Sequence, residues 1–104
     1  MQFLITEQND GSTRHVILQG EFDLASDAAL RAAIMAAVTN SSVECVIIDL
    51  ARVTFLDCST VGSLVYGRNA AEARGCCYEI RHARGLPLRV LRATGIAVVD
   101  KLHS

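Results

Sequence analysis

Residues 43–62, VECVIIDLARVTFLDCSTVG, combine the signals of a buried strand and of a helix start. The first part of this stretch, residues 43–50, contains the apolar run Cys45-Val46-Ile47-Ile48 without alternation, which is typical of a strand covered on both faces in the middle of a sheet. Capping side chains at 57–60 then precede an apolar stripe of helical spacing that runs to Gly75. A buried central strand that leads into a helix indicates an α/β domain.

Changes in periodicity mark the elements on either side of this stretch. Residues 2–6 and 16–22 flank the turn at 9–12 and predict a hairpin. From Ser26 onward the apolar residues follow helical spacing, until residues 40–42 favour leaving the helix. The remaining predicted elements are a strand over Cys77 to Arg81, a short helix that Pro87 opens and Gly95 closes, and an edge strand over Ile96 to Val99. The predicted order is β-β-α-β-α-β-α-β, with helices packed on a mixed sheet, in a single domain over residues 1–104.

The composition restricts the classes of function. A chain of 104 residues that is 51% hydrophobic and 20% charged suits one core that folds alone. Ten basic residues balance eleven acidic ones, so no strong field exists to hold a nucleic acid. The longest apolar stretch is too short to cross a bilayer, and residues 1–4 lack the build of a signal peptide. We therefore expect a cytoplasmic protein without membrane insertion.

The cysteines and histidines do not predict a metal site or a cofactor. The four cysteines are Cys45, Cys58, Cys76 and Cys77, and the three histidines are His15, His82 and His103. An aliphatic core and no export signal favour free thiols over disulfides. The adjacent cysteines lack the spacing that suits zinc, and the histidines are scattered.

The polar turn that follows the central strand carries a resemblance that extends over nearly the whole chain. The run Asp49 to Gly62, with Gly20-Glu21-Phe22-Asp23 before it and Leu91-Arg92-Ala93-Thr94-Gly95 after it, resembles the STAS domain family, in particular stand-alone bacterial anti-sigma factor antagonists. The resemblance implies a non-enzymatic protein that binds an anti-sigma factor with serine kinase activity and so frees a sigma factor. It also implies that this kinase phosphorylates a residue at the start of the second helix and that a phosphatase resets it.

Residue by residue, Asp49, Asp57 and Gly62 match the family pattern, whereas Cys58 occupies the position of the usual phosphorylated serine. The resemblance therefore implies Ser59 or Thr60 as the phosphoacceptor. The partner-binding residues that it implies are Asp23, Asp57, Cys58, Ser59, Thr60, Val61 and Gly62.

Several alternatives stay open from the sequence. Polar residues at 57–60 also occur as plain caps before helices of any function. Cys58 suits a non-phosphorylated STAS subunit of a transporter ATPase or of a stress-signalling scaffold. A thiol at a helix N-terminus can instead become a reactive redox sensor, although cysteine also serves as a small buried filler. An uncovered edge strand would in addition allow a homodimer.

Overall fold

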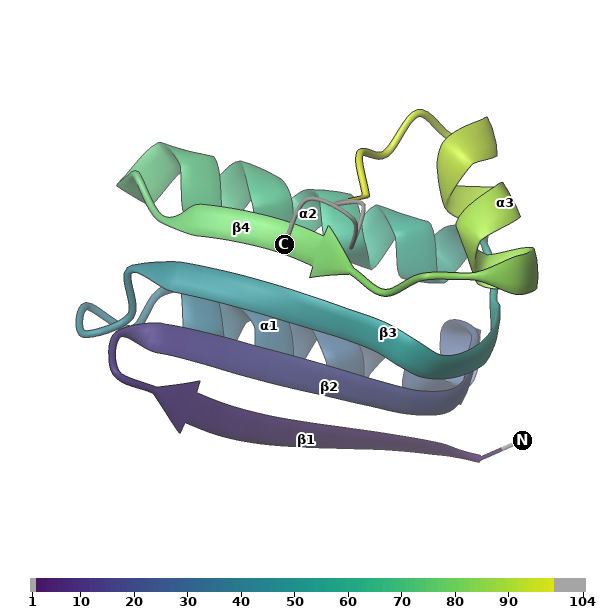
Figure 1. Ribbon diagram of the computed structural model, residues 1–104, viewed down its shortest axis with the longest axis horizontal. Coiled ribbons are helices and arrows are strands. Elements are labelled where there is room, and N and C mark those ends of the chain that lie inside the picture. Colours follow the sequence, from purple (N-terminus) through teal and green to yellow (C-terminus); the bar gives the residue numbers. More distant parts are fainter. Residues whose placement is uncertain (1, 99–104) are drawn as a thin grey trace.

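Four strands form one sheet, and two long helices lie on one of its faces (Figure 1). The computed structural model describes residues 2–98 of the chain. The elements are β1 (Phe3–Asp10), β2 (Thr13–Phe22), the single 3-10 turn η1 (Leu24–Ser26), α1 (Asp27–Val38), β3 (Cys45–Leu56), α2 (Cys58–Arg74), β4 (Cys77–Arg81) and α3 (Gly85–Ala93). The sheet order is β1-β2-β3-β4, with β1 antiparallel to β2 and the other neighbours parallel. This arrangement confirms the predicted α/β fold with a mixed sheet.

The predicted central strand is an inner strand, β3, between β2 and β4. Val46, Ile48 and Leu50 belong to the buried core, because alternate residues of β3 face the helices. The sequence placed the end of this strand at Leu50, but β3 continues to Leu56. Irregularities in its pairing with β2 let the strand bend and continue. The extra length carries the chain to the edge where α2 begins.

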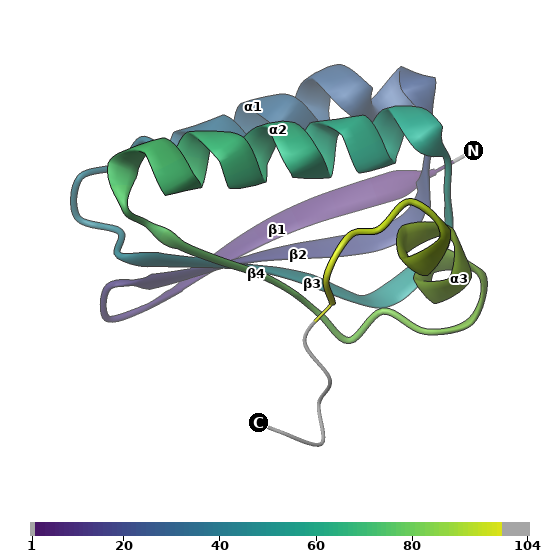
Figure 2. The same cartoon turned by 90° about the horizontal axis from the view of Figure 1, so that it is seen from above.

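The helices α1 and α2 run side by side across the same face of the sheet (Figure 2). Their contact requires a glycine at position 67, because a Cβ there would clash with the Ile34 side chain and lie 2.9 Å from the Tyr78 hydroxyl oxygen. The same hydroxyl donates a hydrogen bond to the Leu64 main-chain oxygen at 2.9 Å. Gly67 therefore lets α1, α2 and β4 approach closely.

The C-terminal elements agree with the prediction in part. The strand at 77–81 and the end of α2 at Gly75, whose φ is 73°, are confirmed. The last helix begins at Gly85, two residues before Pro87, which is buried against the core. The edge strand expected over 96–99 is wrong for residues 96–98, which form no strand, and Val99 lies outside the described residues. Ile96 instead packs its side chain into the core.

Candidate functional site

The start of α2 is organised by the carboxylate of Asp57. Asp57 is the N-cap, and its Oδ1 accepts hydrogen bonds from the Thr60 amide at 3.1 Å and from the Ser59 hydroxyl at 2.7 Å. The Thr60 hydroxyl lies 3.2 Å from the same oxygen. The bond from the Ser59 hydroxyl is the main cause of a lowered pKa at Asp57, and burial opposes it. The carboxylate is therefore held in its charged form at the positive end of the helix.

Thr60 ties this helix start to the end of β2. Its side chain is only 1% exposed, and its hydroxyl donates to the Phe22 main-chain oxygen at 3.0 Å. The Asp57 amide donates to the same oxygen at 3.2 Å. A hydroxyl that is buried and bonded in this way is closed to a kinase in the folded protein. Of the two phosphoacceptor candidates, only Ser59 remains at the surface.

The predicted partner-binding residues lie together but differ in exposure. Cys58 and Gly62 are exposed, and Asp57 and Ser59 are half-buried. Val61 is 7% exposed and belongs to the core. We call residues 57–60 the α2 turn. Its outer surface consists of the Cys58 thiol with the side chains of Asp57 and Ser59.

Asp23 and Leu24 lie beside the α2 turn, because Phe22 precedes them and bonds to that turn. Asp23 caps η1: its carboxylate accepts from the Ala25 amide at 2.9 Å, and its amide donates to the Ser26 hydroxyl oxygen at 3.0 Å. Leu24 is 74% exposed, more than any other large hydrophobic side chain in the described part of the chain. Leu24 was not among the partner-binding residues predicted from the sequence. Its position between two caps, outside any apolar stripe, was the available signal.

A second group missed from the sequence connects α1 to α2 next to the α2 turn. Arg31 Nε donates to the Ser63 hydroxyl oxygen at 3.0 Å and lies 3.6 Å from Asp27 Oδ2. The buried Ser63 hydroxyl in turn donates to the Asp27 carboxylate. The Arg31 guanidinium lies 4.8 Å from the centre of the Tyr66 ring, which is 48% exposed. This network holds a half-buried cation, Arg31, and an exposed ring, Tyr66, next to the α2 turn.

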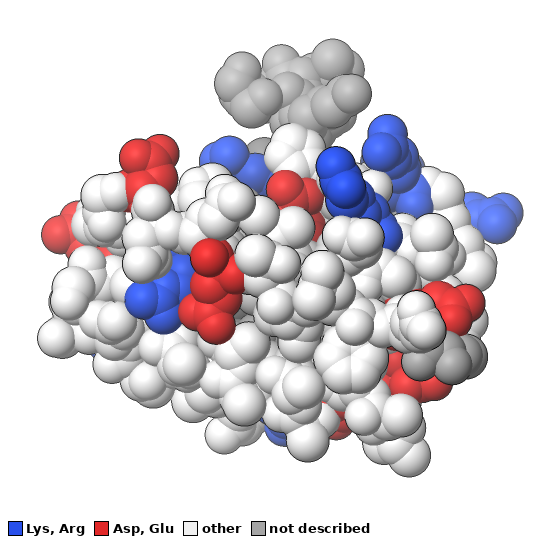
Figure 3. All heavy atoms as spheres, turned by 90° about the horizontal axis from the view of Figure 1, so that it is seen from below, with Lys and Arg blue, Asp and Glu red and all other residues white. Residues whose placement is uncertain are grey.

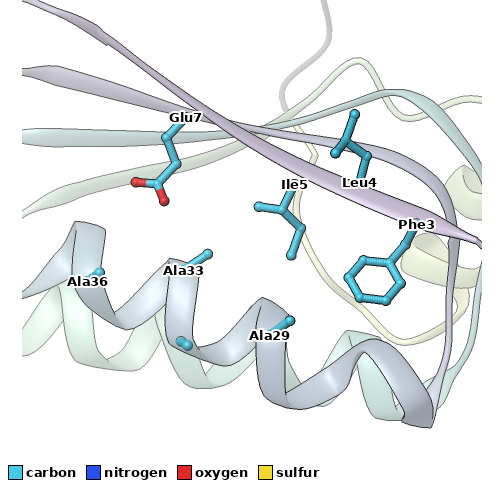
Figure 4. Close-up of a pocket in the computed structure, with 8 residues that line it drawn as sticks. Phe3, Leu4, Ile5, Glu7, Ala29, Ala33 and Ala36 are labelled. Carbon is cyan, nitrogen blue, oxygen red and sulfur yellow. The ribbon is translucent and has the colours of Figure 1, made fainter.

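A shallow groove between β1 and α1 does not offer a catalytic set. It encloses about 470 Å³ and lies along the β1 side, where uncharged atoms form most of the surface (Figures 3 and 4). The lining residues are Phe3, Leu4, Ile5, Glu7, Ala29, Ala32, Ala33 and Ala36. The one ionisable group among them, Glu7, forms an ion pair of 3.3 Å with Arg14. Its chemistry is therefore that of an apolar surface.

The described part of the chain contains neither a group of metal ligands nor a membrane-spanning helix. Within residues 2–98, no three His, Cys, Asp or Glu side chains gather as a metal site would require. All four cysteines are free, as the sequence predicted. His103 lies outside the described residues. In that same part of the chain, no helix combines the length and apolar character needed to cross a membrane.

Comparisons with known proteins identify the fold. A family model described as "Mlab, STAS domain" matches residues 5–102. No curated protein sequence matches the chain. Among solved structures, an anti-sigma factor antagonist from Mycobacterium paratuberculosis is 23% identical, with 98% of this chain and 89% of that chain covered and a TM-score of 0.85. The Bacillus cell fate determinant SpoIIAA in its phosphorylated form is 20% identical, with 96% and 95% covered and a TM-score of 0.74. A sulfate transporter family protein from Wolinella succinogenes is 17% identical, with 81% and 67% covered and a TM-score of 0.69.

Proposed function

We propose that this chain, which belongs to the STAS domain family, binds an anti-sigma factor and thereby releases a sigma factor. The observation that carries the proposal is the exposed surface at the carboxyl end of the sheet. There the α2 turn and the Asp23–Leu24 segment, which come from different parts of the chain, lie side by side. The likeness to a solved anti-sigma factor antagonist from Mycobacterium paratuberculosis supports this choice of partner.

The side chains on this surface suit protein docking. Leu24 presents an apolar anchor, and such anchors at the centre of an interface supply much of the binding energy. Gly62 presents no side chain, so a partner can approach the first turns of α2 closely. Arg31 and Tyr66 form a polar and aromatic rim beside it. The surface therefore combines an apolar centre with charged surroundings.

Phosphorylation of Ser59 is the switch that we propose for this surface. The Ser59 hydroxyl is half-buried and lies in the first turn of α2, where amides without helical partners stabilise an anion. A phosphate there would add nearly two negative charges and end the hydrogen bond from Ser59 to Asp57. Like-charge repulsion beside Asp57 would then disturb the turn and oppose docking. The kinase is the bound anti-sigma factor, and a phosphatase reverses the step.

Binding measurements with purified anti-sigma factor kinases test the docking surface. We expect Leu24→Ala to weaken binding by about tenfold, since a truncated apolar anchor typically costs more than 1 kcal/mol. Ser59→Asp should weaken binding to a similar extent or more, whereas Ser59→Ala should bind as the unmodified protein does. Ser41→Asp is the matched control, because it adds the same charge at an exposed turn outside this surface. Unchanged binding by Leu24→Ala and Ser59→Asp would exclude this surface as the contact.

Incubation of the same proteins with ATP tests the switch separately. In the wild-type chain, mass spectrometry should locate phosphate on Ser59 and none on Thr60, whose hydroxyl is buried. If neither residue carries phosphate and binding is intact, the proposed docking surface stands and the proposed phosphorylation switch is excluded.

A second candidate function is that of a non-phosphorylated STAS subunit in a transporter ATPase or a signalling scaffold. The likeness to a sulfate transporter family protein and the thiol at position 58 favour it. Co-purification from the native cell separates the two, because one predicts a sigma-regulatory kinase and the other a transport or scaffold protein.

A redox role for the exposed Cys58 is tested by its alkylation rate as a function of pH; an ordinary thiol pKa near 8.5 would count against it.

A further inference from the structure

Two thiols face each other at the amino end of the sheet, away from the α2 turn. Cys45 and Cys77 are the first residues of β3 and β4, and they are direct partners in the parallel register. Both strands begin at the left-hand side of the sheet in Figure 1, and β3 ends at the opposite side, next to α2. This pair lies outside the docking surface, so the inference below does not depend on the proposed function.

Both thiols lie on the sheet face that α1 and α2 leave uncovered. Successive side chains of a strand point to opposite faces. Val46 belongs to the core under the helices, so its neighbour Cys45 points away from them. Tyr78 reaches α2 through its bond to the Leu64 main-chain oxygen, so Cys77 points away as well. Cys77 is exposed and Cys45 is half-buried.

The register places Cys45 and Cys77 at a backbone separation that a disulfide can span. Neighbouring strands lie about 4.8 Å apart, which falls inside the Cα separation of roughly 4.4–6.8 Å that disulfides allow. Cys77 is exposed, and a disulfide that is exposed to solvent is easier for small thiols to reduce. The geometry thus suits a labile bond rather than a permanent staple.

We propose that Cys45 and Cys77 are a reversible oxidation site that closes to a disulfide by exchange with a small disulfide such as glutathione disulfide. The thiolate of Cys77 attacks one sulfur of the small disulfide, forms a mixed disulfide and releases one small thiolate. The thiolate of Cys45 then attacks the Cys77 sulfur and releases the second small thiolate. Two electrons pass from the protein thiols to the small disulfide, and their two protons pass to the released thiolates.

The order of attack follows from the surroundings of the two thiols. Burial, followed by the influence of the neighbouring Cys77 thiol, raises the pKa of Cys45 to about 12, so Cys45 is the less readily ionised thiol and enters second. Cys77 is exposed and meets the reagent first. The neighbouring Cys76 is buried, and its sulfur lies 4.0 Å from the Val43 main-chain oxygen, which directs it away from the uncovered face. Cys58 lies at the far end of β3.

Peptide mapping of the full chain after exposure to glutathione disulfide tests the proposal. Trypsin separates Cys45, in residues 32–52, from Cys77, in residues 75–81. The linked pair of peptides should form in the native protein and disappear when dithiothreitol is added. Cys77→Ser should lower its yield by at least about tenfold, because it removes one of the two sulfurs. Cys58→Ser and Cys76→Ala should leave the yield unchanged, and Cys58→Ser is the matched control for loss of an exposed thiol.

Three results would overturn the proposal. One is a link through Cys76 in place of Cys77, and another is a protein that carries only glutathione on Cys77. The third is a 45–77 link that forms faster in urea-unfolded protein than in the native state, because the folded register would then not bring the thiols together. Circular dichroism of each variant before oxidation establishes that the compared proteins are folded.

Discussion

Two helix starts meet at the carboxyl end of the sheet, and they use the same capping chemistry. Each has an aspartate followed three residues later by a buried hydroxyl: Asp23 with Ser26, and Asp57 with Thr60. Both hydroxyls, each about 1% exposed, donate to a main-chain oxygen, of Asp23 in one case and of Phe22 in the other. The capping residues are thus structural at both sites.

The residues between the caps differ, and the difference separates two roles. The first start exposes Leu24, an apolar side chain that contributes nothing to the core. The second exposes Cys58 and part of Ser59, a thiol and a hydroxyl that can be modified. In the function that we propose, the first start supplies an anchor for a partner, and the second supplies the group that regulates binding. A partner that covers both would respond to a change in either.

The comparison is tested most strongly by removing the carboxylate of the second start. Asp57→Ala removes the acceptor for the Thr60 amide and for the Ser59 hydroxyl. We expect the free energy of unfolding to fall by about 2 kcal/mol, the upper end for a lost N-cap, because this cap also orients Thr60 toward Phe22. Urea denaturation followed by circular dichroism measures it. A loss below about 0.5 kcal/mol would mean that the α2 turn does not depend on Asp57.

Loss of the capping carboxylate should cost less stability at the first helix start, which Asp23 caps. Asp23→Ala removes the acceptor for the Ala25 amide, while the bond from the Ser26 hydroxyl to the main chain at position 23 remains. We expect a loss of about 1 kcal/mol in the same denaturation experiment. Equal losses at Asp23 and Asp57 would contradict the tighter organisation of the second start.

The amino-acid sequence predicts most of the fold, because most elements have a local signal. The apolar run of β3, the stripe of α2 and the glycine after it gave the correct elements, and the strand at 77–81 was placed at its exact bounds. The continuation of β3 to Leu56 was missed, since it depends on a bent pairing with β2 that has no local signature. The absence of a strand at 96–98 likewise reflects packing of Ile96 on the core.

The site was predictable in position and less so in detail. The α2 turn was located from its caps, but no local pattern separates the buried Thr60 hydroxyl from the half-exposed one of Ser59. That difference arises because Phe22, which is 38 residues away in sequence, supplies the acceptor for Thr60. The Arg31–Ser63 bond spans 32 residues and was invisible for the same reason.

The charge of Asp57 should also make the stability of the folded protein depend on pH, with a smaller effect than removal of the cap. Hydrogen bonds, first that from the Ser59 hydroxyl, lower the pKa of Asp57 below its usual 3.8. A carboxyl group with a lowered pKa in the folded state stabilises it fully above the unfolded pKa, and this contribution is lost as the pH falls through the folded pKa. Asp57→Asn keeps a good capping side chain without a charge.

We therefore expect Asp57→Asn to lose less stability than the unmodified protein on acidification below about pH 4. Urea denaturation of both proteins at several pH values between neutral and acidic measures the difference. Parallel pH profiles would show that the Asp57 charge makes no contribution to folding.

The smallest effect on the free energy of unfolding is expected at Ser59. Its size shows whether the Ser59 side chain is needed for folding or is free to act as a switch. Ser59→Ala should change the free energy of unfolding by less than about 0.5 kcal/mol, as for surface side chains outside special features. It should still raise the pKa of Asp57 toward its usual value, because the Ser59 hydroxyl is the main cause of the lowered one. Carbon-detected NMR titration of the Asp57 carboxyl group measures this, and Ser41→Ala, which alters an exposed hydroxyl elsewhere, should leave that pKa unchanged. A large loss of stability in Ser59→Ala would make Ser59 a structural residue like Thr60 and Ser26, and the two helix starts would then be alike.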